Sequence, residues 1–280
     1  MSHVLVIGAG GMLGGAMMRR LPRAGLTVTA IDRRRYDILT DAIDALPLAG
    51  IDHVVNCAGL INRYEDSRPA ADFYLINSIF PRRLADHCAQ AGARVIHIST
   101  DCVFDGSPGP HDEGARPCPH DLYGRSKLLG EPANAMVLRT SVIGPEQAHF
   151  RSLLCWFLSV EARCAGYTNH LWSGMTTVAL ADLVARLIGA GRHRTGIFHL
   201  PGEDITKHEL LQRIAETFRH EVVIEPTAAA APRDMRLRTR HPELTEGFVL
   251  PPIAAQLAEL AALCDGQGRW HQPAPVAAAG

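Results

Sequence analysis

The sequence has 280 residues, of which 47% are hydrophobic and 20% charged, and its formal net charge is -1 at pH 7. This balance is typical of a globular protein with a sizeable core. A net charge near zero gives no support for nucleic acid or an anionic membrane surface as a partner. No apolar run reaches the ~18 residues that a membrane span needs, and the N-terminus has no signal-peptide pattern, so we expect a cytoplasmic protein.

Cysteine and histidine give no sign of a metal or disulfide framework. The seven cysteines are scattered and form no C-x-x-C pair, which fits a reducing compartment. The 14 histidines form no H-E-x-x-H pattern. We therefore predict no metal site.

Short apolar segments alternate with helical patterns through the first half of the chain. Val- and Ile-rich segments bounded by turn residues predict strands at 4–7, 27–31, 53–56, 95–99 and 136–139. Between them, apolar residues recur every four positions over 13–21 and 76–88, as on one face of a helix. This alternation predicts an α/β fold with a doubly wound parallel sheet of the Rossmann type.

The pattern is looser beyond residue 150. We predict helices at 150–160, 178–188 and 206–218, strands at 197–200 and 222–224, and a loop at 228–232. The resulting division is a dinucleotide-binding domain at 1–150, to which 176–200 returns, and a small α/β substrate lobe at 151–265. The Pro- and Ala-rich segment 266–280 is expected to be a flexible tail.

A glycine-rich turn directly after the first predicted strand indicates a dinucleotide site. In V-L-V-I-G-A-G-G-M-L-G-G, Gly8 permits the tight turn, Gly11 lets a pyrophosphate approach, and Gly14 lets helix and strand pack closely. Met12 and Leu13 begin the helix, whose free N–H groups and positive dipole end favour phosphate. An ordinary tight turn with the same spacing is the alternative.

The end of the second predicted strand bears on the choice of cofactor. An acidic residue there binds the ribose hydroxyls of NAD, whereas an arginine suits the 2′-phosphate of NADP. Asp32 and Arg33 supply both kinds, and we predict Arg33 as the phosphate ligand, with NADP(H) preferred and NAD(H) also accepted. A solvated arginine loop is the alternative. Cys57, Ala58 and Gly59 end the third strand and are expected to leave room for the adenine-ribose half of the cofactor, with a simple tight exit turn as the alternative.

Hydroxyl and amino groups at the end of the fourth strand and shortly after it predict carbonyl reduction. Tyr123 and Lys127 share one face of a helix, and an adjacent ammonium lowers the high pKa of a tyrosine. We predict that Thr100 polarises a substrate carbonyl and that Tyr123 protonates its oxygen while a nicotinamide supplies hydride. Lys127 is also expected to hold the nicotinamide ribose, and Ser99 and Tyr123 are expected to contact the cofactor. A surface Tyr–Lys pair is the alternative.

With these residues, the chain resembles the extended short-chain dehydrogenase/reductases, and within them the dTDP-4-dehydrorhamnose reductase family. The similarity runs over about residues 3–265, and its most specific pieces are S-T-D-C-V-F-D-G and D-E-G-A-R-P-C-P-H-D-L-Y-G-R-S-K-L-L-G-E. It implies NAD(P)H-dependent reduction of the 4-keto group of a nucleotide-linked 6-deoxy sugar, in deoxysugar and cell-surface polysaccharide biosynthesis. Thr100, Tyr123 and Lys127 match the family's catalytic positions.

Two positions depart from the family pattern. Cys102 stands where the family usually has a tyrosine, and Val142 stands where it usually has a tryptophan. Both positions lie near the sugar in that family, so the resemblance implies a reshaped, less aromatic pocket. The glutamates that hold a metal at the dimer interface of some members have no match near Gly15.

Further substrate contacts are predicted by the same logic. Asp101 is expected to orient the catalytic hydroxyl or to contact the sugar. Trp172 is expected either to form an aromatic wall of the pocket or to pack within the lobe. Arg233 and Arg236 are predicted to neutralise the diphosphate, with a solvated basic loop as the alternative.

Two other functions remain open at this stage. A nucleotide-sugar epimerase or dehydratase would use the same scaffold with a nicotinamide that stays bound and is not consumed. A cofactor-binding regulatory subunit would keep the fold without turnover. The short C-terminal lobe favours the reductase, and the intact Thr100, Tyr123 and Lys127 argue against the subunit. A homodimer is expected by analogy of fold.

Overall fold

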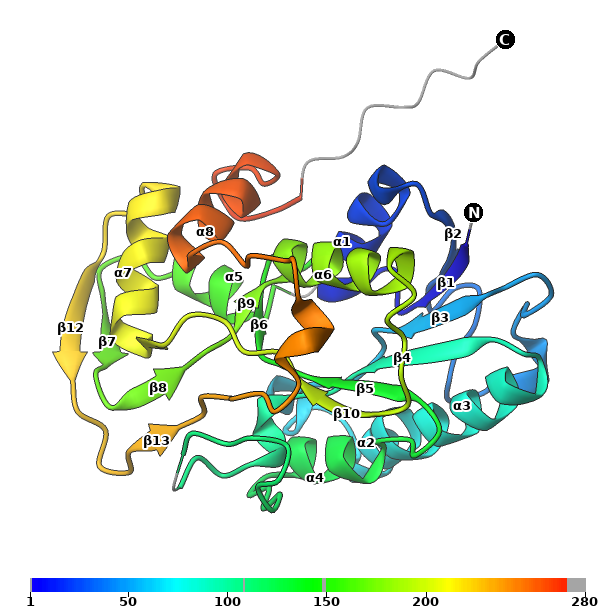
Figure 1. The fold of residues 1–280 in the computed structure, drawn as a ribbon. Helices are drawn as coiled ribbons and strands as arrows, with labels where there is room; N and C mark the ends of the chain where they lie inside the picture. Colours follow the sequence, from blue (N-terminus) through cyan, green and yellow to red (C-terminus); the bar gives the residue numbers. More distant parts are fainter. Residues whose placement is uncertain (1, 108, 148–149, 271–280) are drawn as a thin grey trace, which may run out of the picture.

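The computed structural model describes residues 2–107, 109–147 and 150–270 (Figure 1). At its centre lies a six-stranded sheet in the order β10-β5-β4-β3-β1-β2, and all of its strand pairs are parallel. This is the doubly wound α/β sheet that the strand–helix alternation predicts, and the fold prediction is confirmed. The strands are β1 (His3–Ile7), β2 (Thr27–Ile31), β3 (His53–Asn56), β4 (Arg94–Ile98), β5 (Met136–Arg139) and β10 (Gly196–His199).

The register brings the carboxyl ends of the central strands to one edge of the sheet. Ile7 pairs with Ile31 and with Asn56, and Asn56 pairs with His97. The chain order reverses direction between β1 and β3, so a crevice opens beyond their carboxyl ends. The turns that follow these strands therefore meet at the place where such sheets bind ligands.

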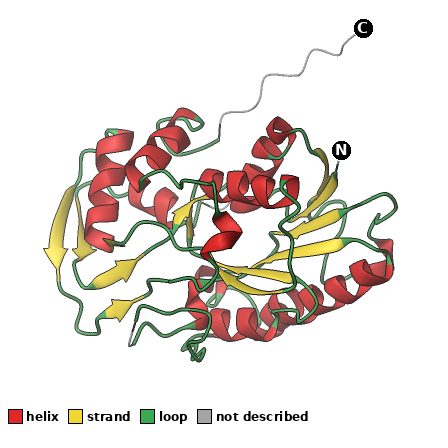
Figure 2. Cartoon of the chain, viewed as in Figure 1, coloured by secondary structure: helices red, strands yellow, loops and turns green. Residues whose placement is uncertain are grey.

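Helices cover both faces of the sheet, as Figures 1 and 2 show. Val4 and Val6 pack with α1 (Met12–Arg20) and α6 (Thr177–Gly189), whereas Leu5 and Ile7 pack with α3 (Phe80–Gln90). Successive side chains of a strand point to opposite faces, so a strand buried on both sides must be apolar throughout. The near-continuous apolar strands of the sequence follow from this arrangement. On the α3 side lie also α2 (Ala70–Phe73) and α4 (Leu122–Leu129).

A smaller lobe stands beside one end of the sheet, with a core of its own. Its helices are α5 (Leu153–Leu158), α7 (Lys207–Phe218) and α8 (Ile253–Ala262). Its strands are β7 (Arg163–Tyr167), β8 (His170–Trp172), β11 (Ile205–Thr206), β12 (Val223–Thr227) and β13 (Arg233–Asp234). Two further short strands, β6 (Val142–Ile143) and β9 (Met175–Thr176), pair where the lobe joins the sheet.

The predicted helix over 76–88 is interrupted. Tyr74–Ile79 forms a π-helical segment, and α3 begins only at Phe80. Pro81 has no N–H to donate to the preceding turn, which weakens regular α-helical bonding at this point. In contrast, α7 begins where expected, because Thr206 and Glu209 form a capping box.

The predicted tail from residue 266 is packed over its first residues. The backbone of Trp270 forms an isolated antiparallel β-bridge with that of Cys264. The centre of the Trp270 ring lies 5.0 Å from the guanidinium of Arg19 on α1. The remaining part of that prediction, 271–280, lies outside the described residues.

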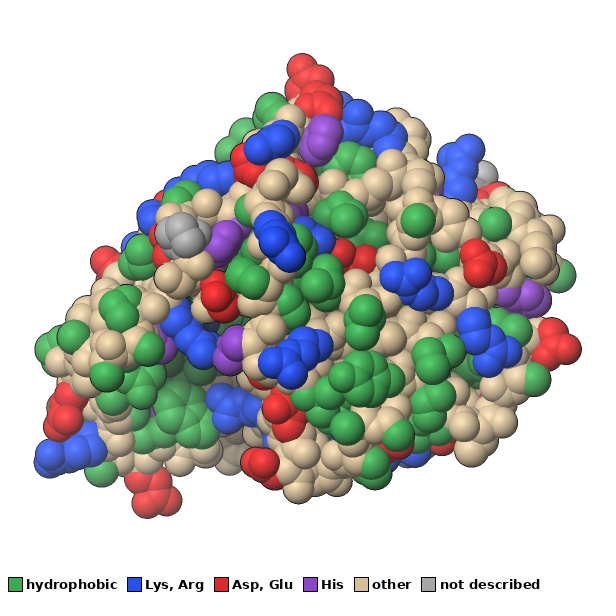
Figure 3. Space-filling view, turned by 90° about the horizontal axis from the view of Figure 1, so that it is seen from below, with side chains coloured by type: hydrophobic (Ala, Val, Ile, Leu, Met, Phe, Trp, Pro, Cys, Tyr) green, Lys and Arg blue, Asp and Glu red, His purple; other side chains and the backbone are tan. Residues whose placement is uncertain are grey.

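Charge is evenly spread over the face seen in Figure 3, where basic side chains are interspersed with acidic ones. The described residues include no helix long and apolar enough to cross a membrane.

Candidate active site

Two adjoining cavities form a cleft along the carboxyl edge of the sheet. One has a volume of about 670 Å³ and lies beyond β1, β2 and β3, and the other, of about 560 Å³, lies beyond β1, β3, β4 and β5. They share the glycine-rich turn and the segment after β3, so the cleft is continuous. The shared lining residues are Gly10, Gly11, Cys57, Ala58, Gly59, Leu60 and Gln147.

The glycine-rich turn has the shape that the sequence predicts. Gly8 has a φ of +79°, and a Cβ there would lie 2.8 Å from the backbone nitrogen of Ala58. A Cβ on Gly14 would overlap the carbonyl oxygen of Gly8, so helix α1 packs on the turn without a side chain between them. Gly11 caps α1 without a side-chain acceptor, and no acidic residue stands in its first turn. The first N–H groups of α1 are therefore available to an anion.

The predicted cofactor residues of this turn divide between the two cavities. Gly8 lines the 670 Å³ cavity, and Met12 and Leu13 line the 560 Å³ cavity. Gly14 lines neither, because it lies in the helix–strand contact.

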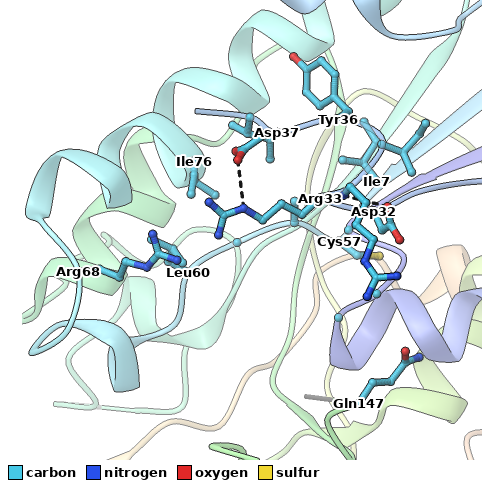
Figure 4. A pocket seen from close by; sticks show the side chains of 18 residues that line it. Ile7, Asp32, Arg33, Tyr36, Asp37, Cys57, Leu60, Arg68, Ile76 and Gln147 are labelled. Atoms are coloured by element: carbon cyan, nitrogen blue, oxygen red, sulfur yellow. Dashed lines mark hydrogen bonds and ion pairs between the residues drawn. The ribbon is translucent and has the colours of Figure 1, made fainter. Parts of the chain in front are cut away.

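Basic and acidic side chains meet in the 670 Å³ cavity after β2. The guanidinium of Arg33 is exposed and donates to Asp37 at 3.1 Å (Figure 4). The Asp32 carboxylate accepts the backbone N–H of Arg34 at 3.0 Å, which holds the turn. Arg68, from a separate segment, lines the same cavity. Of the cations at this end Arg33 alone was predicted, and Arg34 and Arg68 line the same cavity.

The four predicted catalytic and neighbouring residues Ser99, Thr100, Tyr123 and Lys127 all line the 560 Å³ cavity. Thr100 follows β4 and caps a short 3-10 turn, where its hydroxyl accepts the backbone N–H of Cys102 at 3.1 Å. The same hydroxyl donates to the Asp101 carboxylate at 3.1 Å. Asp101 is thus placed for one of the two roles predicted for it, which is to orient the Thr100 hydroxyl.

Helix α4 presents Tyr123 and Lys127 because it packs tightly on that turn. Asp121 caps α4 by accepting the N–H of Gly124 at 2.7 Å. A Cβ on Gly124 would overlap the carbonyl oxygen of Cys102, so only glycine permits this approach. The glycine between Tyr123 and Lys127 therefore sets the distance between the helix and the Thr100 turn.

The surroundings of Tyr123 hold its phenol in the protonated form. Burial raises the pKa of its phenol well above the ordinary value, nearby acidic groups raise it further, and a hydrogen bond with Thr100 lowers it. The ammonium of Lys127 points elsewhere and donates to the carbonyl oxygen of Ile98 at 2.7 Å. Burial lowers the pKa of Lys127 to about 8. The structure thus differs from the expectation that Lys127 lowers the pKa of Tyr123, since each side chain responds mainly to its own burial.

The lobe end of the cavity holds a cation that was not predicted from the sequence. Lys207, the first residue of α7, lines the cavity and places its ammonium 5.0 Å from the centre of the Trp172 ring. Burial raises the pKa of Asp101, and the charge of Lys207 opposes this rise. One signal was available in the sequence: Lys127 and Lys207 are its only lysines.

The two residues that depart from the family pattern both line the cavity; they are Cys102 and Val142. Trp172 does not line it. Its side chain is 2% exposed within the lobe core, and its indole N–H donates to the Ser141 hydroxyl at 2.8 Å. Ser141 in turn lines the cavity and hydrogen-bonds Asp101. Of the two roles considered for Trp172, the structure therefore favours packing, with an indirect influence on Asp101.

The prediction for Arg233 and Arg236 is not supported by the geometry. Neither lines the cleft. Arg236 forms ion pairs with Asp234 at 2.6 Å and Asp204 at 3.1 Å, which raise its pKa, and Arg233 contacts His120 at 2.9 Å. Both guanidinium groups therefore lie outside the two cavities and are not placed to bind a diphosphate there.

Two other arginines do line the 560 Å³ cavity, Arg63 and Arg151. Arg151 donates to the carbonyl oxygen of Arg63 at 3.1 Å and to Ser67 at 3.2 Å. Neither was predicted from the sequence, because no motif marks the short 3-10 turn that holds Arg63 or the segment before α5 that holds Arg151. Within the described ranges there is no group of three His, Cys, Asp or Glu side chains placed to hold a metal ion.

Comparison with known proteins gives a family for this fold and site. Residues 1–264 match the family described as RmlD substrate binding domain. The dTDP-4-dehydrorhamnose reductase of Streptomyces griseus is 31% identical over 97% of this chain and 96% of its own length. That of Mycobacterium tuberculosis is 35% identical over 72% of this chain and 71% of its own length.

A solved structure agrees with these relatives. The dTDP-4-dehydrorhamnose reductase of Bacillus anthracis in complex with NADP matches with a TM-score of 0.78 at 21% identity, over 93% of this chain and 98% of that one. This chain belongs to the RmlD substrate binding domain family, which confirms the resemblance to the dTDP-4-dehydrorhamnose reductases drawn from its motifs.

Proposed function

We propose that the protein is an NAD(P)H-dependent reductase that converts the 4-keto group of a nucleotide-linked 6-deoxy sugar to an alcohol, in deoxysugar and cell-surface polysaccharide biosynthesis. The observation that carries this proposal is the meeting of Thr100, Tyr123 and Lys127 in one cavity, continuous with a glycine-lined cleft. Relatives named dTDP-4-dehydrorhamnose reductase support the same reaction. The proposal includes a cytoplasmic location and, by analogy of fold, a homodimer.

The cleft fits a nicotinamide dinucleotide. Gly8 and Gly14 stand where any side chain would block the turn, which leaves the N-terminus of α1 open to a pyrophosphate. Asp32 and Arg33 would face the adenosine ribose, and Cys57, Ala58 and Gly59 would floor it. Ser99 and Lys127 would face the other end. When bound, the reduced cofactor supplies hydride to the carbonyl carbon.

The 2′-phosphate of NADP(H) would be bound beyond β2. Arg33, Arg34 and Arg68 place three guanidinium groups in the lining of that cavity. Arginine forks match phosphate oxygens, so this charge favours NADPH over NADH. Asp32 uses one carboxylate oxygen for the backbone of its own turn, which leaves its other oxygen for a ribose hydroxyl. The Bacillus anthracis protein binds NADP on the same fold.

The protein's own groups complete the reduction at the carbonyl oxygen. The phenol of Tyr123 is held in its protonated form by burial, and it gives its proton to the oxygen as the new C–H bond forms. Thr100 contacts the same oxygen and is oriented by Asp101. Lys207 would hydrogen-bond the sugar from the lobe side, since it donates no hydrogen bond to another described residue.

The diphosphate of the nucleotide-sugar is assigned to Arg63 and Arg151 in place of Arg233 and Arg236. Both line the 560 Å³ cavity, on the segments that flank it after β3 and before α5. Arg151 is already oriented by two hydrogen bonds, so its planar group can bind phosphate oxygens at a low entropic cost.

The test is loss of the reduced-nicotinamide absorbance when purified protein is mixed with NADPH or NADH and a panel of nucleotide-linked 4-keto-6-deoxy sugars. We expect loss with one of these sugars, and a loss about 10²-fold slower or more when Tyr123→Phe replaces the wild type. Bound cofactor without consumption would instead favour the epimerase or the regulatory subunit. Product analysis by chromatography separates these two, because only the epimerase changes the sugar.

A further inference from the structure

Three buried side chains lie in a row of polar contacts beside the 560 Å³ cavity. Asn56 ends β3, His97 lies on β4, and Lys127 lies on α4; they are 1%, 0% and 4% exposed. The side-chain nitrogen of Asn56 lies 3.1 Å from Nδ1 of His97, and Nε2 of His97 lies 3.4 Å from Nζ of Lys127. The proposed reaction uses only the last of the three.

The backbone fixes which way the Asn56 amide points. Ala58 donates its N–H to Oδ1 of Asn56 at 3.1 Å, so the amide oxygen must face Ala58. The amide nitrogen then faces His97, and it can only donate. Nδ1 of His97 must therefore carry a lone pair and no proton.

Burial fixes the charge of the ring. The pKa of His97 is well below its ordinary value because the ring is fully buried and lies beside Lys127. A neutral imidazole has one proton, and with Nδ1 unprotonated that proton is on Nε2. The N–H of Nε2 therefore points at the amino group of Lys127.

This orientation discriminates between the two forms of Lys127. An ammonium group has three donors and no lone pair, so it cannot accept from Nε2–H. The uncharged amine can accept from His97 and still donate to the carbonyl oxygen of Ile98, which lies 2.7 Å away. His97 therefore stabilises the amine relative to the ammonium.

We propose that Asn56 and His97 form a positioning pair that fixes one tautomer of the imidazole and thereby favours the uncharged amine of Lys127. Its use in catalysis rests on the proposed function: one proton leaves Tyr123 for each carbonyl reduced and must be replaced from solvent, and Lys127, in the lining of the same cavity, is a group that can exchange protons with solvent. The lysine pKa of about 8 agrees with such an exchange near neutral pH.

Other titratable groups around Lys127 also influence its pKa. Glu131, beyond the end of α4, and the Cys57 thiol, after β3, raise the pKa of Lys127, and burial outweighs both. The Glu131 carboxylate is itself paired with Arg139 at 2.7 Å. On α4, Tyr123 lies one turn before Lys127 and is held neutral by burial.

The composition of the chain makes the test direct. Lys127 and Lys207 are the only lysines, so protein labelled with 13C-lysine gives two side-chain signals, and Lys207→Met assigns them. We expect His97→Leu to raise the Lys127 titration midpoint by about one pH unit, since one hydrogen bond to the amine is lost. His97→Gln keeps an N–H donor near the amine and is expected to restore most of the shift. An unchanged midpoint in His97→Leu would overturn the proposal.

A second measurement depends neither on activity nor on whether the His97→Leu variant folds. In 15N-histidine spectra of the wild type, His97 should carry its proton on Nε2 across the neutral range. Asn56→Asp places a carboxylate at Nδ1, so the proton should move to Nδ1 and the Lys127 midpoint should rise. A wild-type proton on Nδ1 refutes the inference. If the tautomer is as expected but no sugar is reduced, the proposed function fails and the Asn56–His97 pair stands.

Discussion

Gly124→Ala tests whether the approach of α4 to the Thr100 turn sets the catalytic geometry. The added Cβ would lie well inside the 3.0 Å that real Cβ atoms keep, and its neighbour is the backbone carbonyl of Cys102, which cannot rotate away. The helix must therefore move, and Tyr123 moves with it. Overpacking of this kind costs about 1–3 kcal/mol of stability. A displacement near 1 Å at a reacting group lowers turnover on the order of 10²-fold.

Gly189→Ala provides a matched control. Gly189 is also helical, at the end of α6, and a Cβ there would meet nothing within 4 Å. Both variants add one methyl group to a helix, so propensity effects cancel in the comparison. Thermal unfolding should show a fall of roughly 2–10 °C for Gly124→Ala only. Equal melting temperatures and equal turnover in the two variants would refute the packing argument.

Four further variants test individual groups. Tyr123→Phe should lose turnover by about 10²-fold or more while keeping cofactor affinity, and unchanged turnover would remove Tyr123 from the reaction. Arg33→Ala should lower the affinity for NADPH more than the affinity for NADH in binding titrations. Equal effects on the two cofactors would favour the alternative that Arg33 belongs to a solvated loop. Lys207→Met should raise KM for the nucleotide-sugar more than it lowers kcat, whereas a loss confined to kcat would contradict a sugar contact. Because the pKa of Lys127 falls from 10.5 to about 8 on folding, unfolded protein binds more protons between these values. The unfolding free energy of the wild type relative to Lys127→Met should therefore rise with pH over that window, and a flat difference in urea titrations would contradict the burial argument.

The sheet and the glycine-rich turn could be predicted because local patterns determine them. A strand buried on both faces must be apolar, and the segments at 53–56 and 136–139 match the fully buried strands β3 and β5 residue for residue. The segment at 27–31 matches the partly buried edge strand β2. The glycines before α1 are dictated by backbone overlaps a few residues apart, chiefly that of Gly14 with Gly8. The residues that follow each strand then reach the same edge of the sheet without any further information.

The lobe side of the site could not be predicted in this way. Arg236 is paired with Asp204, 32 residues away, and that partner is brought to it only by the folded lobe. Trp172 is covered because α7 and α8 close over it, and Lys207 enters the cavity because α7 begins there. The short strands β8 and β13 have three and two residues, which is too few for any periodic pattern to show.

The central claim is net transfer of hydride to a sugar carbonyl, and isotope transfer tests it most directly. Protein is mixed with a nucleotide-linked 4-keto-6-deoxy sugar and NADPH deuterated on the transferred face, and the product is analysed by mass spectrometry and NMR. We predict one deuterium on C4 of the alcohol product for each NADPH oxidised. A product without deuterium, or an altered sugar with all of the NADPH remaining, would contradict the assignment as a reductase.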